Sequence, residues 1–164
     1  MELINRLKDR TPEYDERYDK MITDFTMLQG GRAGTATVSA GWEQGKYFTR
    51  KYEIYMYAAL LGLKKEYRVE IPRGTKKRKF IEMRSWQPQE IVDYIIMGLF
   101  SKSDIDFNAL EEMEGEDVEK ELTKLRGLLE EYANGGFDLI RSKNEEDPAF
   151  FTENENCFLD FLDE

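Results

Sequence analysis

The side chains that most often carry out catalysis are scarce in this sequence. It contains no histidine and a single cysteine, Cys157. The lack of histidine removes the commonest general base, the usual Ser-His and Cys-His pairs, and almost all zinc and iron ligand sets. One cysteine forms neither an iron–sulfur cluster nor an intrachain disulfide. Carboxylates, lysine, tyrosine or a hard cation such as Mg²⁺ would have to supply any chemistry. We therefore predict no catalytic residues, no cofactor, no bound metal and no enzymatic activity.

Two short motifs invite a ligand-binding interpretation, but each lacks residues that the chemistry requires. Gly41-Trp-Glu-Gln-Gly45-Lys46 has the glycines and lysine of a phosphate-binding loop. Its spacing is one residue short, and Tyr47 stands where a magnesium-binding hydroxyl belongs. Asp104-x-Asp106 lacks the glycine and the final glutamate of a calcium loop. We predict a glycine-rich loop at the first and no calcium site at the second.

Positive charge is concentrated in residues 64–84, which hold nine basic and three acidic side chains. Tyr67, Phe80 and Trp86 lie close by, and basic residues interleaved with aromatic ones are typical of phosphate contact and base stacking. A solvated turn, or a patch that pairs with the protein's own acidic half, explains the same pattern. The candidate nucleic-acid contacts, called the basic island below, are Lys64, Lys65, Arg68, Arg73, Lys76, Lys77, Arg78, Lys79 and Arg84.

Negative charge dominates residues 104–164, which hold five basic and twenty acidic side chains. An acidic run near the start of the expected long helix complements the helix dipole and is most simply a solvated face. Two sharper interpretations are a docking surface for a basic partner and a weak divalent-cation site. The candidate partner-binding residues, called the acidic face below, are Glu111, Glu112, Glu114, Glu116, Asp117, Glu119 and Glu121.

The length of 164 residues predicts one compact domain with its own core. The opening Met1-Glu2-Leu3-Ile4-Asn5-Arg6 has an early acid and no apolar run, so we expect neither a signal peptide nor a membrane anchor. The apolar stretches 54–63 and 91–100 are about half the length that crosses a bilayer. With a single cysteine, these features predict a cytoplasmic protein, and nothing indicates its oligomeric state.

The spacing of apolar residues predicts a mainly α-helical domain, a compact bundle around a buried central helix over 50–61, with a minor β-hairpin. Thr11-Pro12-Glu13 is expected to open an N-terminal helix. Strands over 67–71 and 80–83 would form the hairpin. Further helices are expected from Ser85 or Pro88 to Phe100, and from Asn108 to an end at Asn134-Gly135-Gly136. A short helix over 137–141 would follow.

The chain divides into four segments of one domain. Residues 1–28 form N-terminal helices, 29–47 a glycine-rich loop, 48–143 the core and 144–164 an acidic aromatic tail. Five of the twelve glycines lie between Gln29 and Gly45, and so long a connection is either functional or disordered. The tail is expected to dock through Cys157, Phe158, Phe161 and Leu162.

Two segments carry a further signal. They are Phe48-Thr-Arg-Lys-Tyr-Glu-Ile-Tyr-Met-Tyr-Ala-Ala-Leu-Leu-Gly62-Leu-Lys-Lys65 and Glu131-Tyr-Ala-Asn-Gly-Gly-Phe-Asp-Leu-Ile140. Both resemble small accessory proteins associated with bacterial DNA-phosphorothioation (Dnd-type) defence systems. The resemblance extends over about residues 48–143, whereas the N-terminal helix, the glycine-rich loop and the tail depart from it. It implies an accessory role beside DNA-modifying or DNA-restricting machinery. It carries over no catalytic residues.

We therefore predict a non-enzymatic accessory or adaptor protein of a bacterial anti-phage or DNA-modification system, acting by binding a protein partner. Direct binding of DNA or RNA by residues 64–84 is the alternative, less favoured because the whole chain has a net charge of −10. A carboxylate–metal enzyme such as a nuclease is a further alternative, and it requires several acids to converge in one pocket.

Overall fold

The computed structural model describes residues 2–27, 47–110 and 112–164. The predicted glycine-rich loop, including Gly41–Lys46, and Glu111 lie outside the described residues. The elements in chain order are α1 (Glu2–Lys8), β1 (Glu13–Asp15), the 3-10 turn η1 (Glu16–Tyr18), α2 (Asp19–Phe25), α4 (Lys51–Lys64), β2 (Lys77–Lys79), the 3-10 turn η2 (Met83–Ser85), α5 (Gln89–Lys102), α6 (Phe107–Leu110), α7 (Glu116–Glu146), α8 (Phe150–Glu153) and α9 (Cys157–Asp163). The prediction of a mainly α-helical domain with a small antiparallel sheet is confirmed.

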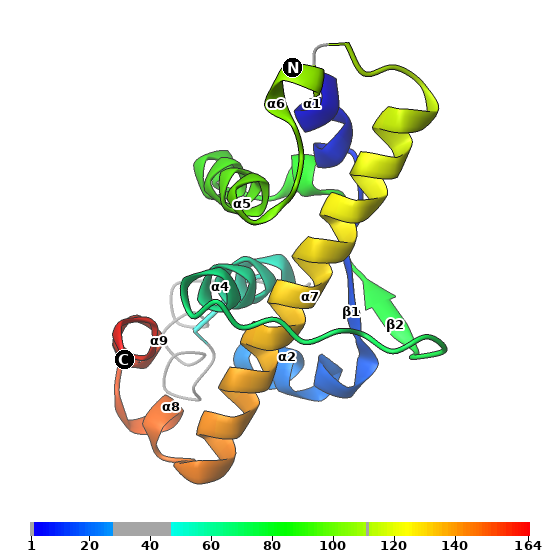
Figure 1. The fold of residues 1–164 in the computed structure, drawn as a ribbon. Coiled ribbons are helices and arrows are strands. Elements are labelled where there is room, and N and C mark those ends of the chain that lie inside the picture. Colours follow the sequence, from blue (N-terminus) through cyan, green and yellow to red (C-terminus); the bar gives the residue numbers. More distant parts are fainter. Residues whose placement is uncertain (1, 28–46, 111) are drawn as a thin grey trace.

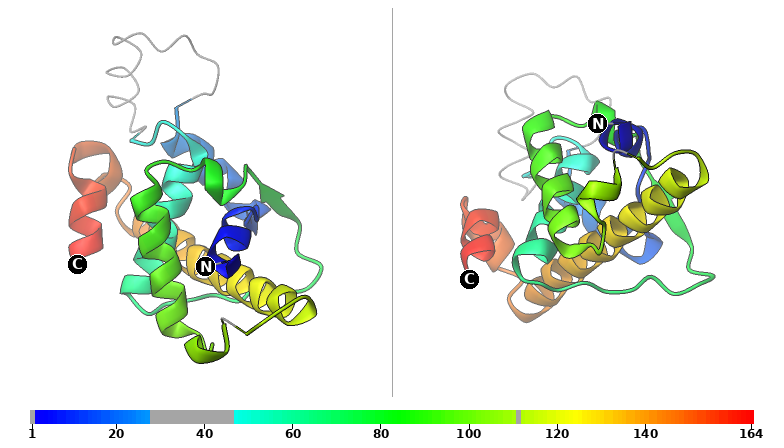
Figure 2. Two further views of the ribbon diagram at one scale, coloured as in Figure 1. Left: turned by 90° about the horizontal axis from the view of Figure 1, so that it is seen from above. Right: turned by 45° about the horizontal axis from the view of Figure 1, so that its top comes forward.

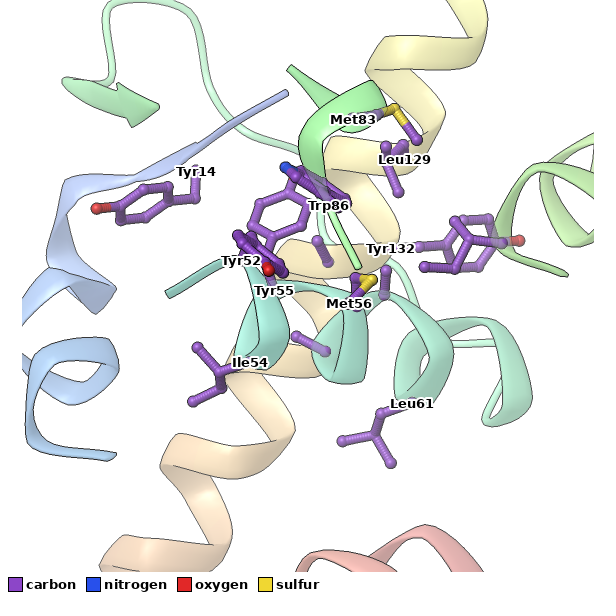
Figure 3. Close-up of a cluster of buried hydrophobic side chains, with 14 of the residues drawn as sticks. Tyr14, Tyr52, Ile54, Tyr55, Met56, Leu61, Met83, Trp86, Leu129 and Tyr132 are labelled. Atoms are coloured by element: carbon purple, nitrogen blue, oxygen red, sulfur yellow. The ribbon is translucent and has the colours of Figure 1, made fainter. Parts of the chain in front are cut away.

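Helix α4 lies at the centre of the molecule, as its all-round apolar sequence predicts. It packs against α2, α5 and the long α7, and Figure 1 shows α4 crossing α7 near the middle of that helix. Its residues Ile54, Tyr55, Ala58 and Leu61 have no exposed surface. Tyr55 packs edge-on against Trp86, and both lie in the aromatic core drawn in Figure 3. Removing this much apolar surface from water is the main favourable contribution to folding.

Three glycines allow the backbones in and around α4 and α7 to touch. A Cβ atom on Gly136 would lie 1.9 Å from the carbonyl oxygen of Ala58, and one on Gly62 would lie 2.1 Å from that of Tyr132. A Cβ on Gly135 would lie 2.3 Å from the carbonyl oxygen of Tyr67. The prediction that α7 ends at Asn134-Gly135-Gly136 is therefore wrong. The glycines serve close packing, and the helix continues to Glu146, including the separate helix expected over 137–141.

The small sheet joins segments that lie far apart in the sequence. β1 pairs with β2 in antiparallel register, with Glu13 opposite Lys79, Tyr14 opposite Arg78 and Asp15 opposite Lys77. The predicted hairpin of 67–71 with 80–83 is wrong, because neither range forms a strand and residues 65–76 cross α7 on the way from α4 to β2 (Figure 1). There the Val69 N–H donates to the carbonyl oxygen of Glu131 at 3.1 Å, and the Asn134 side chain donates to the Val69 carbonyl at 3.1 Å.

Two predicted helix starts are also displaced. The N-terminal helix does not open at Thr11-Pro12-Glu13, because the backbone of β1 is extended and pairs with β2. The Asp15 side chain then accepts a hydrogen bond from the Arg17 N–H, and α2 begins at Asp19. The long helix α7 begins after Gly115, whose positive φ of 57° suits glycine, and not at Asn108, which lies in the short α6.

The C-terminal tail docks through an aromatic cluster, as predicted. Phe151, Cys157, Phe158 and Phe161 are buried, and Phe25 of α2 packs edge-on against Phe158. Figure 2 shows α8 and α9 at the opposite end of the molecule from α6 and the start of α7. None of the helices within the described residues is both long and apolar enough to cross a membrane.

A buried carboxylate fastens β1 to α7. Glu130 is only 6% exposed, and its Oε1 accepts a hydrogen bond of 3.0 Å from the Glu13 N–H. Burial raises the pKa of Glu130, while the Glu13 N–H and the nearby Arg126 act in the opposite direction. The sheet is therefore held to the core by a group that is costly to ionise.

We predict that Gly136→Ala destabilises the fold by about 1–3 kcal/mol or more, because its Cβ would overlap the α4 backbone. Gly127→Ala in the same helix is the matched control, because nothing lies within 4 Å of its added Cβ. That control should gain up to about 1 kcal/mol from helix propensity. Urea unfolding measures both changes, and equal effects at the two positions would contradict the close approach of the two backbones.

The Glu130 carboxyl predicts a specific pH dependence of stability. A raised pKa means that the folded protein binds the Glu130 proton more tightly than the unfolded chain does. The contribution of Glu130 to the free energy of unfolding therefore falls as the pH rises from its ordinary pKa of 4.5 through its raised pKa in the folded protein. Glu130→Gln removes the ionisable group and with it this pH dependence of stability. The stability of the variant minus that of the wild type should therefore increase with pH across this window in urea titrations. A difference that is flat or falls would show that the carboxyl is not buried.

Candidate functional site

The basic island predicted from the sequence is largely neutralised by carboxylates of the same chain. Around β2, the Glu16 carboxylate lies 2.8 Å from Arg78 and 3.2 Å from Lys76. Asp19 lies 3.5 Å from Arg78, and Glu13 is 3.9 Å from Lys77. These acids come from the β1–α2 segment. The expectation that the basic island pairs with the acidic half of the chain, residues 104–164, therefore holds for only some of its residues.

The rest of the island is spread over several elements. Arg84 pairs with Asp9 at 2.6 Å, Lys64 with Asp163 at 3.1 Å and Arg68 with Glu131 at 3.4 Å. The chain after α4 crosses α7 before it reaches β2, so the end of α4 and β2 lie on different sides of that helix (Figure 1). Among the described residues, Lys65, Arg73 and Lys79 have no ion-pair partner. The nine residues do not form one continuous cationic surface.

The pairing is visible in the electrostatics of Glu16. The hydrogen bond from Arg78 is the largest cause of a lowered pKa of the Glu16 carboxyl, followed by that from Lys76. The same pair raises the pKa of Arg78, so the guanidinium keeps its charge. Exposed pairs of this kind contribute little to stability, but they cancel much of the field that would attract a phosphate.

The fold brings two further cations to β2 that the sequence analysis missed. Arg50 and Lys51, at the start of α4, line a pocket of about 390 Å³ together with Arg78 and Lys79. Their proximity depends on the β1–β2 pairing, which no local pattern reveals. One signal was available, because the positive end of a helix dipole disfavours Arg and Lys at a helix start. Residues placed against such a preference often mark a functional position.

The acidic face divides into a paired and an unpaired part. Glu119 accepts from both Arg6 and Arg10, the latter at 2.6 Å, and so fastens α1 to α7. The side chain of Glu121 is 15% exposed and pairs with Lys124 at 2.8 Å, while Asp117 is 3.4 Å from Lys120. The unpaired part consists of Glu112, Glu114 and Glu116, which are exposed and have no ion-pair partner among the described residues.

The acids do not gather into a cation site in the part of the chain that the structure describes. No group of three or more Asp, Glu or Cys side chains there could hold a metal ion. Asp104 lines a separate pocket with Lys102 and Lys124, and the Asp106 side chain accepts the Asn108 N–H at 2.9 Å. This arrangement fits local structure and charged surfaces better than metal ligation.

The described residues form a mainly helical domain with charged surfaces. Residues 38–155 match the model of DNA sulphur modification system-associated protein 4. The chain belongs to this family, which confirms the resemblance identified over about residues 48–143. No curated protein and no solved structure matches the sequence.

We predict that Arg78→Ala raises the pKa of the Glu16 carboxyl toward its ordinary value of 4.5, because it removes the largest cause of the lowering. Arg73→Ala is the control, because Arg73 is exposed and has no ion pair among the described residues. Side-chain carboxyl NMR titrations measure both values. A Glu16 pKa that is already ordinary in the wild type would contradict the neutralised island.

Proposed function

We propose that this protein is a non-catalytic adaptor that binds a basic surface of another protein of the DNA sulphur modification system. The family assignment supports an accessory role in that system. The observation that carries the proposal is the contrast between the two charged surfaces. The basic island is mostly paired within the chain, whereas Glu112, Glu114 and Glu116 are exposed and have no ion-pair partner among the described residues.

The position of these carboxylates suits recognition. Glu116 is the first residue of α7, where the helix dipole stabilises negative charge. The preceding loop is anchored by Met113, which packs against the core, so Glu112 and Glu114 are presented beside a fixed helix end. Opposite charges across an interface speed association and fix the orientation of the partners. A partner with a lysine- or arginine-rich surface is therefore the best match.

An apolar contribution is available on α5. Tyr94 and Met97 are each 66% exposed, although the other face of this helix lies in the core. In Figure 1, α5 lies in the upper part of the view beside α6, and α1 and α6 stand between it and the start of α7. Protein interfaces commonly combine aromatic and methionine side chains with a polar rim. These two residues support a protein partner rather than a purely solvated acidic face.

The alternatives receive less support. Binding of nucleic acid along the whole segment 64–84 would require breaking ion pairs at Lys76, Arg78 and Arg84. A carboxylate–metal nuclease requires converging acids, and the described residues contain no such group.

The test is to measure binding of the purified protein to each other protein of the system, one at a time, by biolayer interferometry. We expect one partner to bind with an affinity that weakens as salt rises. The triple variant Glu112→Gln, Glu114→Gln and Glu116→Gln should weaken that binding about tenfold or more, mainly through slower association. Tyr94→Ser with Met97→Ser should weaken it mainly through faster dissociation.

The matched control replaces three other exposed carboxylates that have no ion pair among the described residues, Glu70, Glu146 and Glu153, by glutamine. It makes the same change in net charge and should leave the affinity nearly unchanged. Equal weakening by the control, or no partner among the proteins of the system, would contradict the proposal.

A further inference from the structure

The pocket at the start of α4 is lined by cationic, aromatic and apolar side chains. Four of its eight lining residues are cationic, namely Arg50, Lys51, Arg78 and Lys79, and none is acidic. They come from two segments that meet only in the folded protein. In a chain with a net charge of −10, such a concentration of positive charge requires a reason.

Two of the four cations are held in place by acids behind them. Lys51 lies 3.5 Å from Asp19, and Arg78 contacts both Asp19 and Glu16. Asp19 also accepts a hydrogen bond of 2.6 Å from the Tyr14 hydroxyl, so it is oriented from a second side. Restricting these side chains in advance reduces the entropy that a ligand must offset on binding.

The other two cations are available to a ligand. Arg50 and Lys79 are exposed, and neither has an ion-pair partner among the described residues. The backbone N–H groups of Thr49 and Arg50 donate to the Glu53 carboxylate at 2.8 and 3.3 Å, which fixes the chain that carries the Arg50 side chain. Because the Glu53 carboxylate already caps the positive end of the α4 dipole, the attraction for a phosphate comes from the Arg50 and Lys79 side chains.

The remaining walls are aromatic and apolar. Phe80 stacks on Tyr14 with ring centroids 4.7 Å apart and an interplanar angle of 15°, and the neighbouring Ile81 is exposed. Tyr52, at the start of α4, completes this side and stacks on the buried Trp86. Figure 3 shows Tyr14 and Tyr52 approaching the aromatic core from β1 and α4. Tyr14 and Tyr52 are buried, so the half-buried Phe80 and the exposed Ile81 form the apolar surface beside the cations. Contact of a base with such a surface accompanies phosphate contact at single-strand sites.

We propose that this pocket binds one nucleotide unit, with its phosphate against Arg50 and Lys79 and its base against the wall of Phe80 and Ile81. A volume of about 390 Å³ lies in the range of pockets for single small ligands and is too small for a duplex. The unit belongs to a single-stranded nucleic acid or is a free nucleotide. This site is distinct from the acidic face, and the inference does not depend on the proposed protein partner.

The experiment measures binding of a short fluorescent single-stranded oligonucleotide by anisotropy over a range of salt concentrations. We expect binding that weakens with salt. Arg50→Ala with Lys79→Ala should reduce the affinity about tenfold or more and make the salt dependence shallower by about one unit for each phosphate that is no longer bound by a cation. Both residues are exposed, so folding should be preserved, and circular dichroism checks it.

The matched control is Lys65→Ala with Arg73→Ala. It removes two other cations of the basic island that have no ion pair among the described residues and lie outside the pocket. Its affinity should stay within about twofold of the wild type, because neither side chain lines the pocket and salt weakens attraction over longer distances. Equal losses in both double variants would overturn the pocket in favour of diffuse attraction, and no binding by the wild type would overturn it as well.

Competition identifies the source of the nucleotide unit. If an unlabelled strand displaces the probe far better than the same concentration of mononucleotide, the ligand is nucleic acid. The other outcome is that the mononucleotide competes as well as the strand does. If the double variant Arg50→Ala with Lys79→Ala then also binds the mononucleotide more weakly, the pocket is supported and its ligand is a free nucleotide. Ile81→Ser should lower the affinity for either ligand two- to fivefold. It should leave the competition by inorganic phosphate unchanged. An equal loss for inorganic phosphate would overturn the assignment of the base to this wall.

Discussion

The close backbone packing of α4 on α7 is the constraint on which the rest of the structure depends. Gly62 and Gly136 face carbonyl oxygens of the opposite helix, and no side chain fits between them. Interiors are packed at the density of organic crystals, so such a crossing tolerates little change in volume. It requires α7 to continue through Asn134 to Gly136. The result is one helix of 31 residues that carries the acidic face at its start and the aromatic tail beyond its end.

The position of the pocket follows from this crossing in three steps. Packing on α7 orients α4, and so places Arg50 and Lys51. Glu130 holds β1 to the same helix, and β1 in turn pairs with β2, which carries Arg78 and Lys79. The four cations therefore converge through contacts made on one scaffold helix. Their mutual repulsion, and that of the α4 dipole, is offset by Asp19 and Glu16 on the adjoining segment.

Much of the fold could be predicted from the sequence because the buried face of an element shows as a regular spacing of apolar residues within that element. The all-round apolar α4, the inward face of α5 and the docked aromatic tail all follow from periodicity. Contacts between segments that are far apart in the sequence produce no such local pattern. Gly135 and Gly136 fit a helix end and a close crossing equally well, and only the partner carbonyls of Tyr67 and Ala58 decide between them. The pairing of β1 with β2 was hidden in the same way. The candidate residues of the basic island were identified by composition, whereas their neutralisation by Glu16 and Asp19, and the addition of Arg50 and Lys51, depend on tertiary structure.

The distribution of charge also explains why an acidic protein can hold a phosphate site. At physiological ionic strength the field of a charge decays over about 8 Å, and salt therefore limits the effect on the pocket of Glu112, Glu114 and Glu116, which do not line it. At long range the net charge of −10 opposes approach of nucleic acid, and only a phosphate placed within the pocket comes close to Arg50 and Lys79, the two cations there without an ion pair among the described residues. Non-specific binding along a strand is therefore suppressed while local binding is retained. A basic protein partner on the acidic face would reduce the long-range repulsion without touching the pocket, and in this way the two surfaces would support each other.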